Sequence, residues 1–308
     1  MSELTGLSII IVSWNTRELL RRCLASIYEN PPARPFETWV VDNGSQDGSA
    51  QMVRDLFPRV RLIENQSNAG FAAANNQVFP LCTGEYVLLL NPDTVVLPGA
   101  VDGLLSYLDS HPEAGAVGPR LVSADGADQL SVFPFPTLSR ELWRLFHLDR
   151  VAPYALYDPR RWDTSAPHEV DSIQGACLMV RRQAVPPPGL FDPDYFLYSE
   201  EIDLCFRLRR AGWKLDWIPA AAVVHLGGQS SRQEVKKSFL NLYRGKILFF
   251  RKHYGRAQAF GYRCVLAVSA LVRIALSPVA WLEPAARRED LLTRAGNYLA
   301  LLGVIWNL

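Results

Sequence analysis

Residues 85–93 read EYVLLLNPD, and this stretch decides the fold. Its first part is a short, continuous apolar run, which is typical of a β-strand buried on both faces. Its end is polar, because Asn91, Pro92 and Asp93 follow the run without a gap. A strand of this kind belongs to a sheet that helices cover on both sides, and its polar end is where a ligand would bind.

The chain before residue 85 repeats the same unit. Strands are predicted at residues 7–12, 38–41 and 60–64. Helical spacing of apolar residues predicts helices between them, over residues 18–28, 51–57 and 72–81. Strands that alternate with helices in this way form a mostly parallel, doubly wound α/β sheet, and ligands bind beyond the carboxyl ends of its strands.

Beyond residue 97 the alternation is less regular. Helices are predicted over residues 98–112 and 200–211, and strands over residues 115–119, 170–181 and 213–224. Residues 123–168 are rich in Pro, Asp, Trp and Tyr and have weak periodicity, so we expect an irregular segment that is partly loop. The last predicted strand leads directly into His225.

The composition is that of a globular protein and gives no case for nucleic acid as a partner. The 308 residues include 32 Lys and Arg against 31 Asp and Glu, so the net charge of +1 attracts no polyanion. The five cysteines are widely spaced and form no CxxC pair, which argues against a disulfide framework or a zinc site. With no signal peptide visible, we expect a protein of the reducing cytoplasm.

The polar end at residues 91–93 has two interpretations. A carboxylate at the end of a buried strand can hold Mg²⁺ or Mn²⁺, which would stabilise a diphosphate leaving group. Alternatively, Asp93 caps the helix that is predicted to begin near Pro98. His225 would join a metal site only if the fold returns it to the neighbourhood of Asp93.

Three other polar clusters have similarly divided interpretations. Residues 42–48 (DNGSQDG) could bind a base or ribose, or simply build a turn. Residues 68–76 (NAGFAAANN) place a glycine at a helix start, which suits either a phosphate or close packing on the sheet. The acids in residues 200–203 (EEID) favour the positive end of a helix, or one of them is a general base.

Taken together, these motifs resemble the family 2 glycosyltransferases, which are nucleotide-sugar enzymes of GT-A fold. The matches run in order over about residues 5–255, at residues 12–15, 41–48, 68–71, 91–94, 175–176, 200–204 and 224–225. The rhamnosyltransferase-like branch, which builds bacterial polysaccharide or cell-wall linkers on lipid carriers, is the most similar. The resemblance implies a GT-A catalytic domain over residues 1–255 and an inverting, metal-dependent hexosyltransferase.

The resemblance also implies roles for individual residues. The residues expected to bind the nucleotide-sugar are Ser13, Asn15, Asp42, Asn43, Asn68, Gly70, Asn75, Asn91 and Gly175. Asp93 and His225 are expected to be the metal ligands, for Mg²⁺ or Mn²⁺. Asn91 stands where the metal signature of the family has its first Asp, so Asp93 is the one firm carboxylate there.

The catalytic base is expected among the acids of residues 200–203. The family pattern is Glu-Asp followed by another acid and Leu, and Glu201 stands here where Asp is usual. Glutamate can do the same chemistry, but its extra methylene group moves the carboxylate. The candidates are therefore Glu201 and Asp203, and we favour Glu201.

The C-terminal part differs in composition from the rest. Residues 236–263 contain eight Lys or Arg and no acid, with aromatic residues between them. Two apolar runs follow, at residues 264–272 and 274–282, and neither reaches the ~20 residues of a spanning helix. We expect residues 256–308 to be amphipathic helices on a membrane surface, at the inner face of the cell membrane, with part of residues 236–254 packed on the catalytic domain.

The function expected from these features is transfer of a sugar, with rhamnose as the first candidate, from a dTDP-, UDP- or GDP-linked donor to a lipid-linked glycan. Two alternatives remain. A sugar nucleotidyltransferase would need a glycine-rich basic loop after the first strand, and Ser13-Trp14-Asn15 is not one. A catalytically inactive nucleotide-sugar-binding or scaffold protein would bind the donor without turnover.

Overall fold

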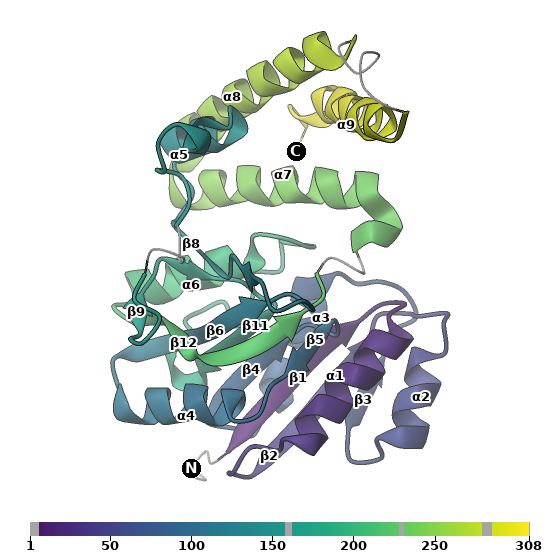
Figure 1. Ribbon diagram of the computed structural model, residues 1–308, viewed down its shortest axis with the longest axis vertical. Helices are drawn as coiled ribbons and strands as arrows, with labels where there is room; N and C mark the ends of the chain where they lie inside the picture. Colours follow the sequence, from purple (N-terminus) through teal and green to yellow (C-terminus); the bar gives the residue numbers. More distant parts are fainter. Residues whose placement is uncertain (1–5, 158–161, 228–230, 279–284, 308) are drawn as a thin grey trace. The chain divides into compact units, whose positions relative to one another are not determined.

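The computed structural model describes residues 6–157, 162–227, 231–278 and 285–307 (Figure 1). The chain forms two compact units. The sheet unit comprises Met1–Phe135, Tyr157–Phe196 and Glu200–Gln233, and the helical unit comprises Pro136–Leu156, Leu197–Ser199 and Glu234–Leu308. The division into a catalytic domain over residues 1–255 and a membrane-associating region over residues 256–308 concerns function, and it stays a prediction.

The centre of the sheet unit is a mixed sheet built from long parallel pairs. Its first strands are β1 (Leu7–Ser13), β2 (Phe36–Asp42), β3 (Arg61–Glu64) and β4 (Tyr86–Leu90). They lie side by side in the order β3-β2-β1-β4, and all three pairings are parallel. The sequence prediction of a mostly parallel α/β sheet is confirmed for this half. Because the register sets Ser13 beside Asp42 and Ile11 beside Leu90, the polar residues after these strands share one edge.

The helices between these strands are also those that the sequence predicts. They are α1 (Arg17–Glu29), α2 (Ser49–Leu56) and α3 (Phe71–Val78), and the predicted helix that follows β4 is α4 (Ala100–Ser110). Figure 1 shows α1 and α4 in front of the sheet. The apolar side of α1, at Leu20, Cys23, Leu24 and Ile27, packs into the same core as the buried strand residues Ile9 and Ile11. Burial of this apolar surface fixes the sheet and therefore the positions of its polar edge.

The second half of the sheet contains a strand that the sequence analysis missed. Its strands are β5 (Thr94–Val96), β6 (Ala114–Val122), β11 (Cys177–Arg181) and β12 (Lys214–His225). β11 runs antiparallel to β4 and β6, whereas β6 and β12 are parallel. β5 pairs antiparallel with the end of β12 and sets His225 opposite Thr94. A three-residue strand directly after a turn has too few residues to show a period, yet this one returns His225 to the neighbourhood of Asp93.

The segment that was expected to be irregular holds several short elements. They are β7 (Asp128–Gln129), β8 (Val132–Phe133), α5 (Leu138–Leu145) and β9 (His168–Glu169). The single strand predicted over residues 170–181 is interrupted, because Ser172–Ile173 (β10) pairs with β8 before β11 begins. The interruption at residues 174–176 brings the backbone of Ala176 to Asn91, whose N–H donates to the Ala176 carbonyl at 2.9 Å.

The helical unit is formed by α7 (Val235–His253), α8 (Gly255–Leu276), α9 (Ala285–Val304) and α5. Its core is aromatic and aliphatic, with the rings of Phe250 and Tyr262 stacked at 4.7 Å between centroids. The expectation of two apolar runs that are both too short to span a membrane is wrong. α8 is one continuous helix of 22 residues, and by length and composition alone it could cross a membrane, with 28% of its most apolar part buried.

The helical unit also buries a group of charges. Glu141 on α5 contacts Lys246 on α7 at 2.7 Å and Arg144 at 2.7 Å, and the Glu141 side chain is only 5% exposed. Burial by itself would raise the pKa of Glu141, but the charges of Lys246 and Arg144 outweigh it and lower the pKa to about 2. The carboxylate is thus charged at all ordinary pH values and neutralises the buried Lys246 and the half-buried Arg144.

Replacing Glu141 with glutamine should destabilise the helical unit by about 3–5 kcal/mol, because it leaves the buried Lys246 without its partner. Hydrogen exchange of α7 and α8 amides measures this loss. Glu234→Gln is the matched control, since Glu234 forms an exposed pair with Lys237 at the same spacing of three residues. We expect no measurable change there. Equal exchange in both variants would contradict the account.

The same pair predicts how stability depends on pH. Because the folded pKa of Glu141 lies below its ordinary value of 4.5, the stabilisation is complete above that value and is lost as the pH falls toward about 2. Glu141→Gln should lack this part of the acid dependence.

Candidate active site

Asp93 and His225 meet at the carboxyl edge of the sheet. Asp93 follows β4 in the turn before β5, and His225 is the last residue of β12. The distance between Asp93 Oδ1 and His225 Nε2 is 3.5 Å, and both side chains are buried. The Leu226 N–H also donates to the Asp93 carbonyl at 2.9 Å, which fixes the two strand ends together. The structure therefore brings together two residues that are 132 positions apart in the sequence.

A carboxylate and an imidazole are suitable ligands for Mn²⁺, and the carboxylate also suits Mg²⁺. Within the described part of the chain, no group of three or more His, Cys, Asp and Glu side chains could hold a metal ion. The Asp93–His225 pair would therefore supply two ligands and leave the other positions to phosphate oxygens and water. Mg²⁺ and substrate phosphates are commonly bound in this way. The residues present thus fit a metal that binds together with a diphosphate.

Asp42 has an unsatisfied oxygen at the same edge. It is the last residue of β2, and its Oδ1 accepts a hydrogen bond from the Ser45 N–H at 2.8 Å. Its Oδ2 is buried and has no hydrogen-bond partner among the residues that the structure describes. A buried carboxylate oxygen left in this state requires a donor from a ligand or water. Asp42 is therefore able to accept a hydrogen bond from a bound base or ribose.

Asn15 and Ser13 shape the loop after β1. Asn15 has a left-handed backbone with φ of 49°, and its Oδ1 accepts from the Gln46 N–H at 2.8 Å. Its own N–H donates to the Ser45 hydroxyl at 2.9 Å. The Ser13 hydroxyl lies 2.9 Å from the Thr16 hydroxyl and is fully buried. These contacts tie the loops after β1 and β2 into one rigid rim around Asp42.

Asn43 and Asn68 connect that rim to the start of α3. The Asn43 Nδ2 donates to the Asn68 Oδ1 at 3.3 Å and to the Gly70 carbonyl at 3.2 Å. Asn68 Oδ1 in turn accepts from the Gly70 N–H at 2.9 Å. Gly70 has φ of +87°, and a Cβ there would lie 2.5 Å from the Phe196 carbonyl oxygen. This position thus requires a glycine for two reasons: the positive φ disfavours other residues, and a side chain would clash with the Phe196 backbone.

Asn75 is buried on α3, where its Nδ2 donates to the Phe71 carbonyl at 2.9 Å. Its neighbour Asn76, which the sequence analysis did not single out, holds the segment before the acids. Asn76 donates to the Phe191 carbonyl at 2.8 Å and accepts from the Phe191 N–H at 3.0 Å. Two hydrogen bonds from one side chain to a distant backbone residue leave no recognisable pattern in a sequence.

The acids at the start of α6 (Glu200–Arg210) have different surroundings. Asp203 is buried and accepts from Arg207 Nε at 2.7 Å. Arg207 also donates to the carbonyls of Pro186, Gly189 and Leu190. Asp203 thereby anchors the loop before the helix. Glu200 is buried too, and burial together with the charge of Glu201 raises its pKa well above the ordinary value.

Glu201 lies beside Gly175. A Cβ placed on Gly175 would be 3.5 Å from the Glu201 Cβ and 3.9 Å from the Phe71 ring. The adjacent Ala176 accepts a hydrogen bond from Asn91. Gly175 and Glu201 therefore border the same edge of the sheet as Asp93. Asn91 itself is half-buried, and its carbonyl accepts from the Thr94 hydroxyl at 2.7 Å. The structure thus brings the candidate base and Gly175 to the edge of the sheet that also carries the candidate metal ligands.

Three comparisons place this chain among known proteins. The family model described as "Glycosyl transferase family 2" matches residues 8–183. The N-acetylglucosaminyl-diphospho-decaprenol L-rhamnosyltransferase of Mycobacterium tuberculosis is 30% identical over 270 residues, which cover 81% of this chain and 85% of that protein. Rhamnosyltransferase WbbL of Escherichia coli is 30% identical over 161 residues, which are 50% of this chain and 57% of that protein.

The solved structures confirm the expected GT-A-like fold. The mannosyltransferase of Pyrobaculum calidifontis, solved with GDP-Man and Mn²⁺, superposes with a TM-score of 0.60 at 17% identity. The match covers 99% of this chain and 88% of that one. Fold, motif order and family model agree, and the chain belongs to glycosyl transferase family 2.

Proposed function

We propose that this glycosyltransferase moves a rhamnosyl group from a nucleoside-diphosphate sugar to a hydroxyl of a lipid-linked glycan in bacterial polysaccharide or cell-wall synthesis. The meeting of Asp93 and His225 at 3.5 Å carries the proposal, because it would form a diphosphate-binding centre at the sheet edge that also carries the unsatisfied oxygen of Asp42. The names of the similar rhamnosyltransferases support the sugar and the lipid-linked acceptor. dTDP-rhamnose is the first candidate donor, ahead of UDP- and GDP-linked sugars.

The donor would bind along the polar edge of the sheet. Asp42 would accept a hydrogen bond from the base or ribose, and Ser13, Asn15 and Asn43 would keep its loop in place. Asn68, Gly70 and Asn75, in and just before α3, and Asn91 after β4 would line the rest of the nucleotide-sugar. Asp93 and His225 would hold Mg²⁺ or Mn²⁺, which when bound stabilises the negative charge of the diphosphate.

Glu201 would act as the general base. The acceptor hydroxyl gives its proton to the Glu201 carboxylate as its oxygen bonds to the anomeric carbon. The bond between that carbon and the diphosphate oxygen breaks, and attack from the opposite face inverts the configuration. Burial and the charge of Glu201 both raise the pKa of Glu200, which would favour placing the negative charge of this pair on Glu201. Gly175 leaves room for the sugar or acceptor next to this carboxylate.

The test of this function is transfer to a defined acceptor. The full-length protein is incubated with Mn²⁺, polyprenyl-diphospho-N-acetylglucosamine and, in separate reactions, dTDP-rhamnose, UDP-glucose or GDP-mannose. Mass spectrometry of the lipid product should show addition of one deoxyhexose from dTDP-rhamnose. Addition of a hexose instead would overturn the proposed sugar, and donor binding without any product would favour an inactive binding protein.

The helical unit would place the enzyme at the inner face of the cell membrane. On α8, apolar side chains at Phe260, Val268, Leu271, Val272 and Leu276 are 40% to 61% exposed. Arg251, Lys252 and Arg256 are exposed close to its start. An apolar helix face flanked by basic residues binds the surface of an anionic membrane. Residues 256–308 would thus keep the enzyme close to its lipid-linked acceptor.

Replacing both Leu271 and Leu276 with serine should weaken binding to phosphatidylglycerol vesicles by more than about 100-fold, because each leucine that enters lipid contributes about 1.5–3 kcal/mol. Vesicle co-sedimentation measures the change. Leu56→Ser with Leu81→Ser is the matched control, since these leucines are similarly exposed on the sheet unit. Equal binding of both double variants would remove α8 as the membrane contact.

A further inference from the structure

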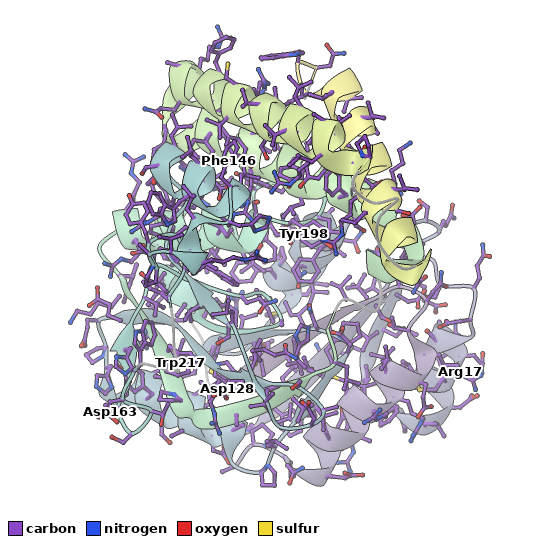
Figure 2. All side chains as sticks on the ribbon, turned by 45° about the horizontal axis from the view of Figure 1, so that its top comes forward. Arg17, Asp128, Phe146, Asp163, Tyr198 and Trp217 are labelled. Atoms are coloured by element: carbon purple, nitrogen blue, oxygen red, sulfur yellow. The ribbon has the colours of Figure 1, made fainter. Side chains whose placement is uncertain are left out.

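We propose that Gln129 is a positioning residue that fixes the imidazole of His225 in one tautomer and aims its Nε2 lone pair at the metal. Gln129 lies on β7, next to Asp128, which Figure 2 labels. β7 is only two residues long, and the resemblance to the family assigned it no role. The inference rests on the proposed function, since it concerns the site that Asp93 and His225 form.

Two hydrogen bonds join the Gln129 amide to His225. The Gln129 Nε2 donates to the His225 backbone carbonyl at 2.8 Å. The Gln129 Oε1 lies 3.0 Å from the His225 Nδ1. The NH₂ group and the oxygen of the Gln129 amide therefore both contact His225, which is the last residue of β12.

The first of these bonds determines the orientation of the amide. A backbone carbonyl can only accept, so the amide NH₂ must face it, and a flipped amide would set two acceptors against each other. The amide oxygen is then left facing Nδ1, and this oxygen can only accept as well. Nδ1 must consequently carry the proton.

The tautomer decides what the other ring nitrogen can do. In a neutral imidazole with the proton on Nδ1, Nε2 has a free lone pair and can be a metal ligand. His225 Nε2 is the atom that lies 3.5 Å from Asp93 Oδ1. With the proton on Nε2 instead, the nitrogen would donate toward Asp93 and could not bind a metal. Hydrogen bonds to the second nitrogen set the ligand orientation in this manner at many metal sites.

The tautomer can be observed directly in the metal-free protein. Two-bond ¹H–¹⁵N correlation of protein labelled with ¹⁵N-histidine distinguishes the two tautomers, and a His225→Gln variant assigns the signal among the five histidines. The spectra are recorded at alkaline pH values at which the His225 signals no longer change with pH, so that the neutral ring is observed. We expect wild-type His225 to be protonated on Nδ1.

Gln129→Leu should release the ring, so that the Nε2-protonated form becomes populated. Gln129→Glu loses the N–H that donates to the His225 carbonyl but keeps an acceptor for Nδ1–H, so it should retain the wild-type tautomer, which separates positioning from a loss of folding. Asp128→Asn is the neighbouring control, because Asp128 is exposed and pairs with Arg120 at 3.5 Å. Its His225 signal should be unchanged. A wild-type ring protonated on Nε2, or a Gln129→Leu spectrum like the wild type, would overturn the inference.

A second measurement addresses the metal. With saturating nucleoside diphosphate, Mn²⁺ affinity measured by electron paramagnetic resonance should fall about 10- to 100-fold in Gln129→Leu and stay unchanged in Asp128→Asn. Unchanged affinity in Gln129→Leu would overturn the role of Gln129 toward the metal. Absence of Mn²⁺ binding in the wild type would instead overturn the proposed metal site, while the spectra still decide whether Gln129 sets the tautomer.

Discussion

Glu201→Gln is expected to lower the rate of sugar transfer by about 10²- to 10⁴-fold, the usual contribution of a positioned general base. Glutamine has nearly the shape of glutamate but cannot take the proton of the acceptor hydroxyl. Donor binding and thermal stability should stay close to wild type, because the side chain is half-buried beside a glycine. A single-turnover assay with saturating donor measures the chemical step. Full activity of the purified variant would contradict the assignment of Glu201.

A substitution at Asp203 distinguishes a catalytic base from a residue that only stabilises the fold. Asp203→Ala leaves Arg207 without its carboxylate in a buried setting, so the main effect should be a loss of about 3–5 kcal/mol in the free energy of unfolding. Denaturant titration measures this loss. If Asp203→Ala kept its stability and lost only its rate, Asp203 would be the better candidate for the base.

Asp93→Asn is expected to lower transfer by about 100-fold or more, because the diphosphate loses a stabilising charge at its metal. The amide is similar in size, so the fold should persist. Activity of the variant should rise with Mn²⁺ concentration beyond the range in which the wild type is saturated. Asp128→Asn, which removes an exposed carboxylate from nearby β7, is the control and should transfer normally. Normal activity of Asp93→Asn at low Mn²⁺ would contradict the metal assignment.

The sequence predicted the parallel half of the sheet well, because β1 and β4 are buried along their whole length and consist mainly of apolar residues. It could not predict β5, whose three residues pair only because β12 arrives beside them. The same limit applies to α8. Arg273 interrupts the apolar pattern, but in the fold it donates to the Leu145 carbonyl and lies over the Tyr298 ring, so the helix continues through it.

The candidate site, like the fold, could be predicted only in part from the sequence. Residues that follow strands, such as Asp42 and Asp93, were placed correctly at one edge, because parallel strands end together. Gln129 and Asn76 could not be found, since each acts through hydrogen bonds to one residue in a distant part of the chain. Local pattern identifies the residues that face a ligand, whereas the residues that hold them depend on tertiary pairing.

The most direct test of the account is calorimetric titration of dTDP, UDP and GDP into the full-length protein, with and without Mn²⁺. The account predicts that one of the three nucleotides binds preferentially, that Mn²⁺ strengthens this binding, and that Asp93→Asn loses the Mn²⁺ effect but retains its fold. The preferred nucleotide would then name the donor class. Binding that is equally tight without Mn²⁺ and in Asp93→Asn would contradict the claim that Asp93 and His225 form the diphosphate-binding metal centre.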